Sequence, residues 1–225
     1  FYRGVVLSTP YQVGLQYTYD YLFLDMDGFL SRHTPTLSGT LIPPSFTIPG
    51  IGTVGNLTNV LTRYQVKQFF REPGDNDTRF QSESRDAFNI MTGFVHAFRL
   101  LEDRVLIRIG YQYDNEAADG GAFSYRGNRL QTGGQVTVPW GNLTLRYDYD
   151  VHWRNYKNSQ TLFTDDGGNL SKRDDTQQTH LVQLIKPLPY NLTFTAQYQH
   201  IRNGSDIPVY DYTKNVFTGL FTWSY

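Results

Sequence analysis

The sequence of 225 residues contains no cysteine and two methionines, and nothing in it approaches a long apolar run. Without cysteine, a disulfide framework and any thiolate metal site are excluded. Without about 18 consecutive apolar residues, no transmembrane helix is predicted. The 20 basic and 21 acidic residues leave a net charge of −1, which gives no reason to expect a nucleic acid as partner.

Aromatic residues, in contrast, are abundant. They make up 16% of the chain, as 17 Tyr, 15 Phe and 3 Trp, although the mean hydropathy is −0.47. High aromatic content combined with low mean hydropathy is expected where apolar and polar residues alternate along strands that have lipid on one face and water on the other.

The last nine residues show this alternation most clearly. Counting by twos places aromatic residues and one glycine on one face: Phe217, Gly219, Phe221, Trp223 and Tyr225. The other face carries Thr218, Leu220, Thr222 and Ser224. A period of two indicates a strand. A strand that ends on an aromatic residue resembles the C-terminal signature of Gram-negative outer-membrane β-barrels.

The same alternation recurs along the chain. In 143–154 the apolar parity carries Leu, Tyr, Val and Trp, and the other carries Thr, Arg, Asp and His. Stretches 11–23, 105–114 and 192–202 repeat it, 60–70 and 130–138 follow it with more exceptions, and 180–188 is ambiguous. A charged residue facing the bilayer midplane costs about 2–4 kcal/mol for Arg or Lys, so lipid on one side is the simplest cause of this contrast.

Strands and connections can be counted from these patterns. Eleven strands are expected, at 2–8, 11–25, 31–43, 57–72, 84–100, 104–116, 122–138, 142–157, 173–187, 191–203 and 209–225. Short turns near 101–103, 139–142 and 187–191 alternate with long polar connections near 73–85, 115–124, 157–175 and 203–211. Short periplasmic turns and longer extracellular loops are typical of outer-membrane barrels.

An odd strand count is unusual for such a barrel. Either strands lie upstream of Phe1, or the count fails within 26–56, where Pro43, Pro44 and Pro49 indicate an irregular connection over 43–56. The predicted fold is an all-β, transmembrane antiparallel up-and-down β-barrel. We expect about 12 strands, in a range of about 12–16. Residues 1–225 would form a single barrel domain, the C-terminal part of a longer protein.

The run from Arg202 to Val216 carries a more specific pattern, in which Asn203-Gly204-Ser205-Asp206-Ile207 leads to Tyr210-Asp211-Tyr212-Thr213-Lys214-Asn215. It resembles the penultimate-loop signature of barrels that follow periplasmic tetratricopeptide repeats, including the surface lipoprotein assembly modifier family. Tyr125–Arg129 and Lys172–Asp175 are further matches. The resemblance covers 85–225 and is weak over 1–84. It implies an export or surface-display role and a periplasmic repeat domain or partner.

Charged residues on the polar parity are the candidate lumen lining: Arg63, Lys67, Arg108, Asp114, Arg146, Asp148, Asp150, His152 and Arg154. They would tune the passage of a polar solute. Alternatively, opposite charges on adjacent strands neutralise one another and support the wall. The similar numbers of both signs argue against a strongly ion-selective pore.

Aromatic residues of the other parity are predicted to lie toward strand ends and to form a membrane girdle: Tyr17, Tyr19, Tyr147, Tyr149, Trp153, Trp223 and Tyr225. The corresponding partners are outer-membrane lipid, lipopolysaccharide and the barrel assembly machinery. The predicted location is the bacterial outer membrane.

Candidates for metal binding and catalysis are weak. The acidic clusters at 25–28, 114–119 and 165–169 could supply oxygen ligands to calcium, but their composition is also that of solvated turns, so no metal or cofactor is expected. Residues 199–204 are faintly similar to the His-x-Ser-Asn-Gly motif of outer-membrane phospholipases, but Arg202 occupies the nucleophile position. His152 with Asp150 could mimic the His-Asp pair of omptin-type proteases or form a plain polar ladder. The chain is not expected to be an enzyme.

The sequence therefore favours a conduit or export platform for a polymer, lipoprotein or polar solute. The alternative is a membrane anchor with a closed lumen, which tethers a surface or periplasmic assembly. A soluble β-sandwich that binds carbohydrate is a third possibility, but it leaves the aromatic face of 217–225 without an explanation.

Overall fold

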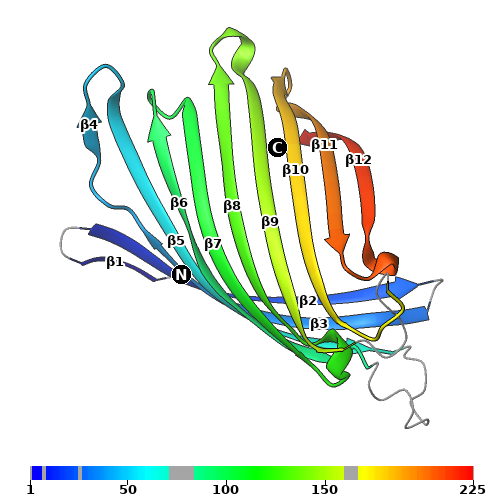
Figure 1. The fold of residues 1–225 in the computed structure, drawn as a ribbon. Coiled ribbons are helices and arrows are strands. Elements are labelled where there is room, and N and C mark those ends of the chain that lie inside the picture. Colours follow the sequence, from blue (N-terminus) through cyan, green and yellow to red (C-terminus); the bar gives the residue numbers. More distant parts are fainter. Residues whose placement is uncertain (1, 7–8, 25–26, 71–83, 160–166, 225) are drawn as a thin grey trace.

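A single antiparallel sheet makes up the protein (Figure 1). The computed structural model describes residues 2–6, 9–24, 27–70, 84–159 and 167–224. The strands are β1 (Tyr2–Val6), β2 (Thr9–Leu24), β3 (Asp27–Leu41), β4 (Phe46–Ile48), β5 (Gly52–Phe69), β6 (Ala87–Leu100), β7 (Val105–Ala118), β8 (Tyr125–Val138), β9 (Leu143–Ser159), β10 (Lys172–Leu188), β11 (Leu192–Ser205) and β12 (Tyr212–Trp223). Each strand pairs with the next along the chain, except that β4 lies off this path. The prediction of an all-β, antiparallel up-and-down fold is confirmed.

The proline-containing region between β3 and β5 holds the main departure from the expected strands. β4 pairs with the beginning of β5, with Phe46 opposite Val54 and Ile48 opposite Gly52. Gly50 and Gly52 have φ values of 81° and 97°, a conformation that suits glycine and lets the chain reverse here. The prediction of an irregular connection over 43–56 is therefore wrong, because a hairpin forms and β5 begins at Gly52.

Connections at the two ends of the sheet differ in length. Three tight turns, at 101–104, 139–142 and 189–191, lie at one end, which is uppermost in Figure 1. We call it the short-turn end. The connections 119–124 and 206–211 lie at the opposite end, which we call the long-connection end. The expected connections at 73–85 and 157–175 run from this same end, but residues 71–83 and 160–166 fall outside the described ranges.

The two faces of the sheet differ in polarity. Opposed residues of paired strands share a face, so Ile109, Thr132 and Tyr149 lie on one face, and Arg108, Gly133 and Asp148 lie on the other. The first, which we call the outer face, exposes large apolar side chains along most of the sheet. On the second, polar side chains reach across an intervening strand, as Arg108 of β7 does to Asp148 of β9. The sheet curls around this second face, which we call the inner face (Figure 1).

Register also resolves the ambiguous stretch 180–188. Val182 and Leu184 lie on the outer face, opposite Tyr147 and Leu145. Leu181 lies on the inner face, opposite Asp148. Ile185 also lies on the inner face, opposite Thr144, so the stretch follows the general rule with two exceptions, Leu181 and Ile185.

Two edges of the sheet remain unpaired within the described residues. β1 covers only Thr9–Val13 of β2, and β12 pairs with β11 alone. Because eleven strands alternate along the path, β1 and β12 run in the same direction. The described residues thus form an open, curved sheet rather than a closed barrel. No helix in the described part of the chain has the length and apolar character needed to span a membrane.

Candidate functional site: a charged network on the inner face

All nine residues predicted to line a lumen lie on the inner face. Strand register places them there from three strands: Arg63 and Lys67 from β5, Arg108 and Asp114 from β7, and Arg146, Asp148, Asp150, His152 and Arg154 from β9. The period of two in the sequence is sufficient to assign this face. Whether the face encloses a lumen stays a prediction.

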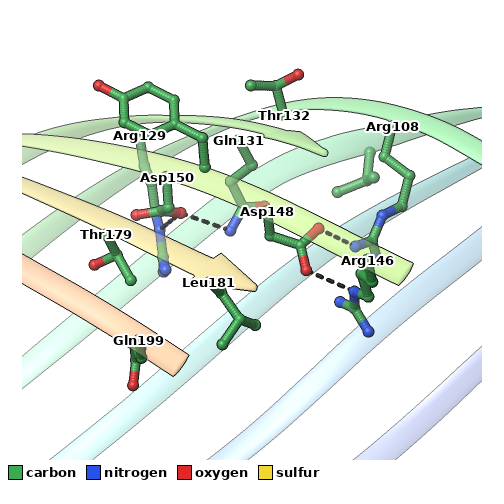
Figure 2. A pocket seen from close by; sticks show the side chains of 12 residues that line it. Arg108, Arg129, Gln131, Thr132, Arg146, Asp148, Asp150, Thr179, Leu181 and Gln199 are labelled. Atoms are coloured by element: carbon green, nitrogen blue, oxygen red, sulfur yellow. Dashed lines mark hydrogen bonds and ion pairs between the residues drawn. The ribbon is translucent and has the colours of Figure 1, made fainter. Parts of the chain in front are cut away.

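Asp148 is the centre of one part of the network, shown in Figure 2. Its carboxylate accepts a hydrogen bond from Arg108 Nη2 and another from Arg146 Nε, the latter over 2.6 Å. Gly133 of β8 lies between β7 and β9, and a Cβ atom at this position would collide with the Asp148 carboxylate. The glycine thus leaves the space that lets Arg108 reach the carboxylate two strands away.

Asp150 forms a second carboxylate centre beside the first (Figure 2). Its Oδ2 accepts hydrogen bonds from Arg129 Nε over 2.6 Å and from Gln131 Nε2 over 3.0 Å. A depression of about 270 Å³ lies between these groups and the side chains of Leu181 and Gln199. Val95 and Tyr149 also line it, so arginines, carboxylates and amides stand beside apolar groups in a space that can accommodate water or a small polar group.

Asp114 of β7 binds His152 rather than an arginine. His152 Nε2 lies 3.0 Å from Asp114 Oδ1, and the Tyr125 hydroxyl donates to Asp114 Oδ2 over 2.9 Å. Asp150, the expected partner of His152, instead binds Arg129. In the contacts of the described residues, the Tyr125 hydroxyl is bound to Asp114 beside His152, and no serine, threonine or cysteine is bonded to His152.

The long-connection end of the inner face holds the most buried charges. The guanidinium of Arg173 lies between the rings of Tyr156 and Tyr210, with its Cζ 3.8 Å from each centroid. Its Nη2 also lies 3.0 Å from Asp175 Oδ2, and both side chains are almost fully buried. Arg154 approaches the same Asp175 oxygen to 4.0 Å.

Residues of the connection between β11 and β12 complete this cluster. Asn203 Nδ2 donates to the carbonyl oxygen of Tyr210 over 2.7 Å, and the side chain of Ile207 is fully buried. These contacts hold the connection against the inner face. A depression of about 330 Å³ next to it is lined by Lys67, Arg85, Arg154 and Arg173, together with Glu116 and aromatic rings.

Several members of the network were not among the predicted site residues: Glu116, Arg129, Arg173 and Asp175. Arg129 lies two residues before Gln131 and therefore has the same parity. Extending the alternation of 130–138 toward the N-terminus would have placed it on the inner face. Glu116 had been assigned to an acidic loop, but β7 continues to Ala118. Arg173 and Asp175 follow a register shift between Lys172 and Asp174, and no sequence signal marks a bulge there.

The remaining candidates lie apart from this network. His200 of the phospholipase-like stretch is on the outer face, where its Nδ1 lies 2.8 Å from Asn215 Oδ1. Among the described residues, no three His, Asp or Glu side chains come close enough to hold a metal ion. Asp25, Asp165 and Asp166 of the acidic clusters fall outside the described ranges.

The predicted girdle residues lie on the outer face, except Tyr225, which falls outside the described residues. Trp223 ends β12, as expected for a girdle residue, but the position of four tyrosines along their strands differs from the expectation. Tyr17 and Tyr19 are near the middle of β2, and Tyr147 and Tyr149 lie well inside β9. Strands of 16 and 17 residues are longer than the roughly 9–11 that cross a bilayer, so in a membrane the ends of these strands would lie beyond its hydrocarbon core.

Comparison of the chain with protein families, curated proteins and solved structures finds no match: no family model, no curated protein and no solved structure is similar to it.

Proposed function

We propose that the protein is an outer-membrane β-barrel that acts as a conduit, passing or presenting a polymer, a lipoprotein or a polar solute. The observation that carries this proposal is the polarity of one continuous sheet. On its outer face, Leu145 is 50% exposed, Ile109 48% and Phe217 78%. Its inner face is charged along the middle strands. If water surrounded both faces, the apolar side chains of the outer face would stay exposed to water. Lipid at the outer face and water at the inner face match the polarity of both faces.

Closure of the sheet is the first step of this proposal. In a bilayer every backbone polar group needs a partner, so the free edges of β1, β2 and β12 cannot face lipid. Because β1 and β12 run in the same direction, an all-antiparallel closure between β1 and β12 needs an odd number of further strands. β2 runs opposite to β12, so the part of β2 that β1 leaves uncovered, 14–24, can instead pair with β12 directly in an antiparallel barrel.

A passive mechanism follows from the inner face. Paired arginines and carboxylates hold water along the wall, so a polar solute does not lose its hydration abruptly on entering. The outer membrane supplies lipid and lipopolysaccharide as partners, and the barrel assembly machinery would insert the chain. The resemblance of 202–216 to barrels that follow tetratricopeptide repeats supports an export role, with a periplasmic repeat domain or partner protein supplying specificity.

Single-channel recording from the protein in a planar bilayer tests the proposal. A conduit gives steady openings of the size expected for a water-filled pore. A folded, inserted and electrically silent protein would contradict it, and a protein that folds without detergent or lipid would contradict the membrane location.

A second function, that of a membrane anchor with a closed lumen, is favoured by one observation. Inner-face carboxylates are bound by side chains from other strands, as Asp148 is by Arg108 and Glu116 is by Lys67. Such pairs bridge the wall and reduce the free space inside it. Insertion without conductance is the result that would select this function.

A further inference from the structure

The charges on the inner face are not balanced. In the described strands, register and side-chain contacts place eleven basic residues on it: Arg3, Arg32, Arg63, Lys67, Arg99, Arg108, Arg129, Arg146, Arg154, Arg173 and Lys214. They place six acidic residues there: Asp20, Asp114, Glu116, Asp148, Asp150 and Asp175. The other described residues include seven basic and eight acidic ones. The net charge of −1 therefore conceals a basic inner face.

Two arginines share one carboxylate in two places on this face. Asp148 lies between Arg108 and Arg146. Asp175 lies beside Arg173, at 3.0 Å, and Arg154, at 4.0 Å. Each group of three carries one positive charge more than a neutral pair would. The ion pairs therefore fix the positions of the cations without cancelling their charge.

Arg63 adds a further cation near the middle of β5. It has no ion pair with another described residue, and its Nε is buried without a hydrogen-bond partner. Asp114, which also faces inward, is already bound by His152 and Tyr125. In a partly enclosed wall of low dielectric, such a guanidinium acts on a passing ion more strongly than it would in bulk water.

We infer that the inner face selects anions, so that the cargo of the proposed conduit is an anionic solute or an acidic polymer. This inference rests on the proposed function, and it replaces the expectation from the sequence that both signs balance. Rings of Arg and Lys favour anions in channels, and guanidinium groups bind carboxylate, sulfate and phosphate with well-oriented hydrogen bonds.

The reversal potential in a gradient of potassium chloride tests the sign of this selectivity. With the protein in a neutral planar bilayer, we expect chloride to be more permeant than potassium at about 0.1 M salt, where the screening length is about 10 Å. The preference should weaken toward 1 M salt, where that length is about 3 Å. A conducting pore that prefers potassium, or has no preference at low salt, overturns the inference and leaves the conduit intact.

Three variants assign the effect to named residues. Arg63→Gln and Arg146→Gln each remove a positive charge, so the ratio of chloride to potassium permeability should fall. Asp148→Asn should raise it. Arg202→Gln is the matched control, because Arg202 lies exposed on the outer face and its removal should leave the reversal potential unchanged. Equal shifts for Arg202→Gln and Arg63→Gln would contradict an inner-face origin.

A binding measurement covers the case of a silent protein. Polygalacturonate, an acidic polymer, should raise the thermal unfolding temperature of the protein in detergent, and neutral dextran should not. Arg63→Gln should reduce this shift, and Arg202→Gln should retain it. Binding without conductance would keep the anion preference and remove the conduit. A silent protein that polygalacturonate does not stabilise would overturn both.

Discussion

The guanidinium carbon of Arg173 lies 3.8 Å from the ring centroid of Tyr156, which places a cation of β10 directly over an aromatic ring of β9. The ring centroid of Tyr210, from the connection between β11 and β12, also lies 3.8 Å from this guanidinium carbon. One side chain therefore links two strands and a connection at the long-connection end of the sheet.

Replacement of Arg173 by methionine should destabilise the protein. The change removes both stacking contacts and leaves Asp175, whose side chain is 2% exposed, without its 3.0 Å partner. Loss of one partner of a buried ion pair costs about 3–5 kcal/mol. Because Arg154 stays 4.0 Å from the Asp175 carboxylate in the variant, we expect a loss near the lower limit of this range. The free energy of unfolding in detergent, measured with urea, checks this.

The double variant Arg173→Met with Asp175→Asn separates two contributions to stability, the ion pair with Asp175 and the stacking of Arg173 on aromatic rings. Asparagine removes the buried negative charge, so the double variant should regain part of the lost stability. If it is no more stable than Arg173→Met alone, the ion pair does not contribute and the aromatic contacts account for the effect.

Gly127→Ala should disrupt the cluster around Asp114. A Cβ atom at Gly127 would overlap Asp114 Oδ1 and lie 2.6 Å from His152 Nε2. Because both side chains are held between neighbouring strands, we expect a loss of about 1–3 kcal/mol in the free energy of unfolding. Gly134→Ala is the control in the same strand, since its nearest neighbour would be the Leu106 carbonyl oxygen at 3.8 Å. Equal losses of stability in the two variants would show that the effect comes from the change in backbone freedom and not from a collision with Asp114 and His152.

The faces of the sheet could be predicted from the sequence because a strand has a period of two. Arg146, Asp148 and Asp150 alternate with Leu145, Tyr147 and Tyr149, and one residue in register fixes all the others. The inner-face position of all nine predicted lumen residues follows from this rule alone.

The partners within that face could not be predicted. Arg108 and Asp148 are separated by 40 residues and by the whole of β8, and their contact depends on the stagger of three strands and on Gly133. Arg173 and Asp175 lie after a bulge, where parity counting loses its reference. The bulge also hides the face of Arg173, and without Arg173 and Arg129 the basic excess of the inner face is smaller.

Ile109→Arg tests whether the outer face lies in lipid. Ile109 is 48% exposed on the outer face of β7, and an arginine at the bilayer midplane costs about 2–4 kcal/mol. We expect weaker insertion into lipid vesicles, detected as loss of the heat-modifiable band on gel electrophoresis. Gln199→Arg, which adds the same charge beside the inner depression, should insert normally. Normal insertion of Ile109→Arg would contradict a lipid-facing position.

Hydrogen exchange along β12 tests closure of the barrel. In the open sheet, β12 pairs only with β11, so alternate amides of Tyr212–Trp223 point away from any partner and should exchange rapidly. In a closed barrel those amides are bonded on the second side, and all of them should be protected to the level of the central strand β8. The measurement on the protein in detergent micelles, read residue by residue, distinguishes the two. We expect uniform protection, because unpaired amides in the hydrocarbon region would each cost several kcal/mol. An alternating pattern of protection would show that the sheet stays open and would remove the basis for a conduit.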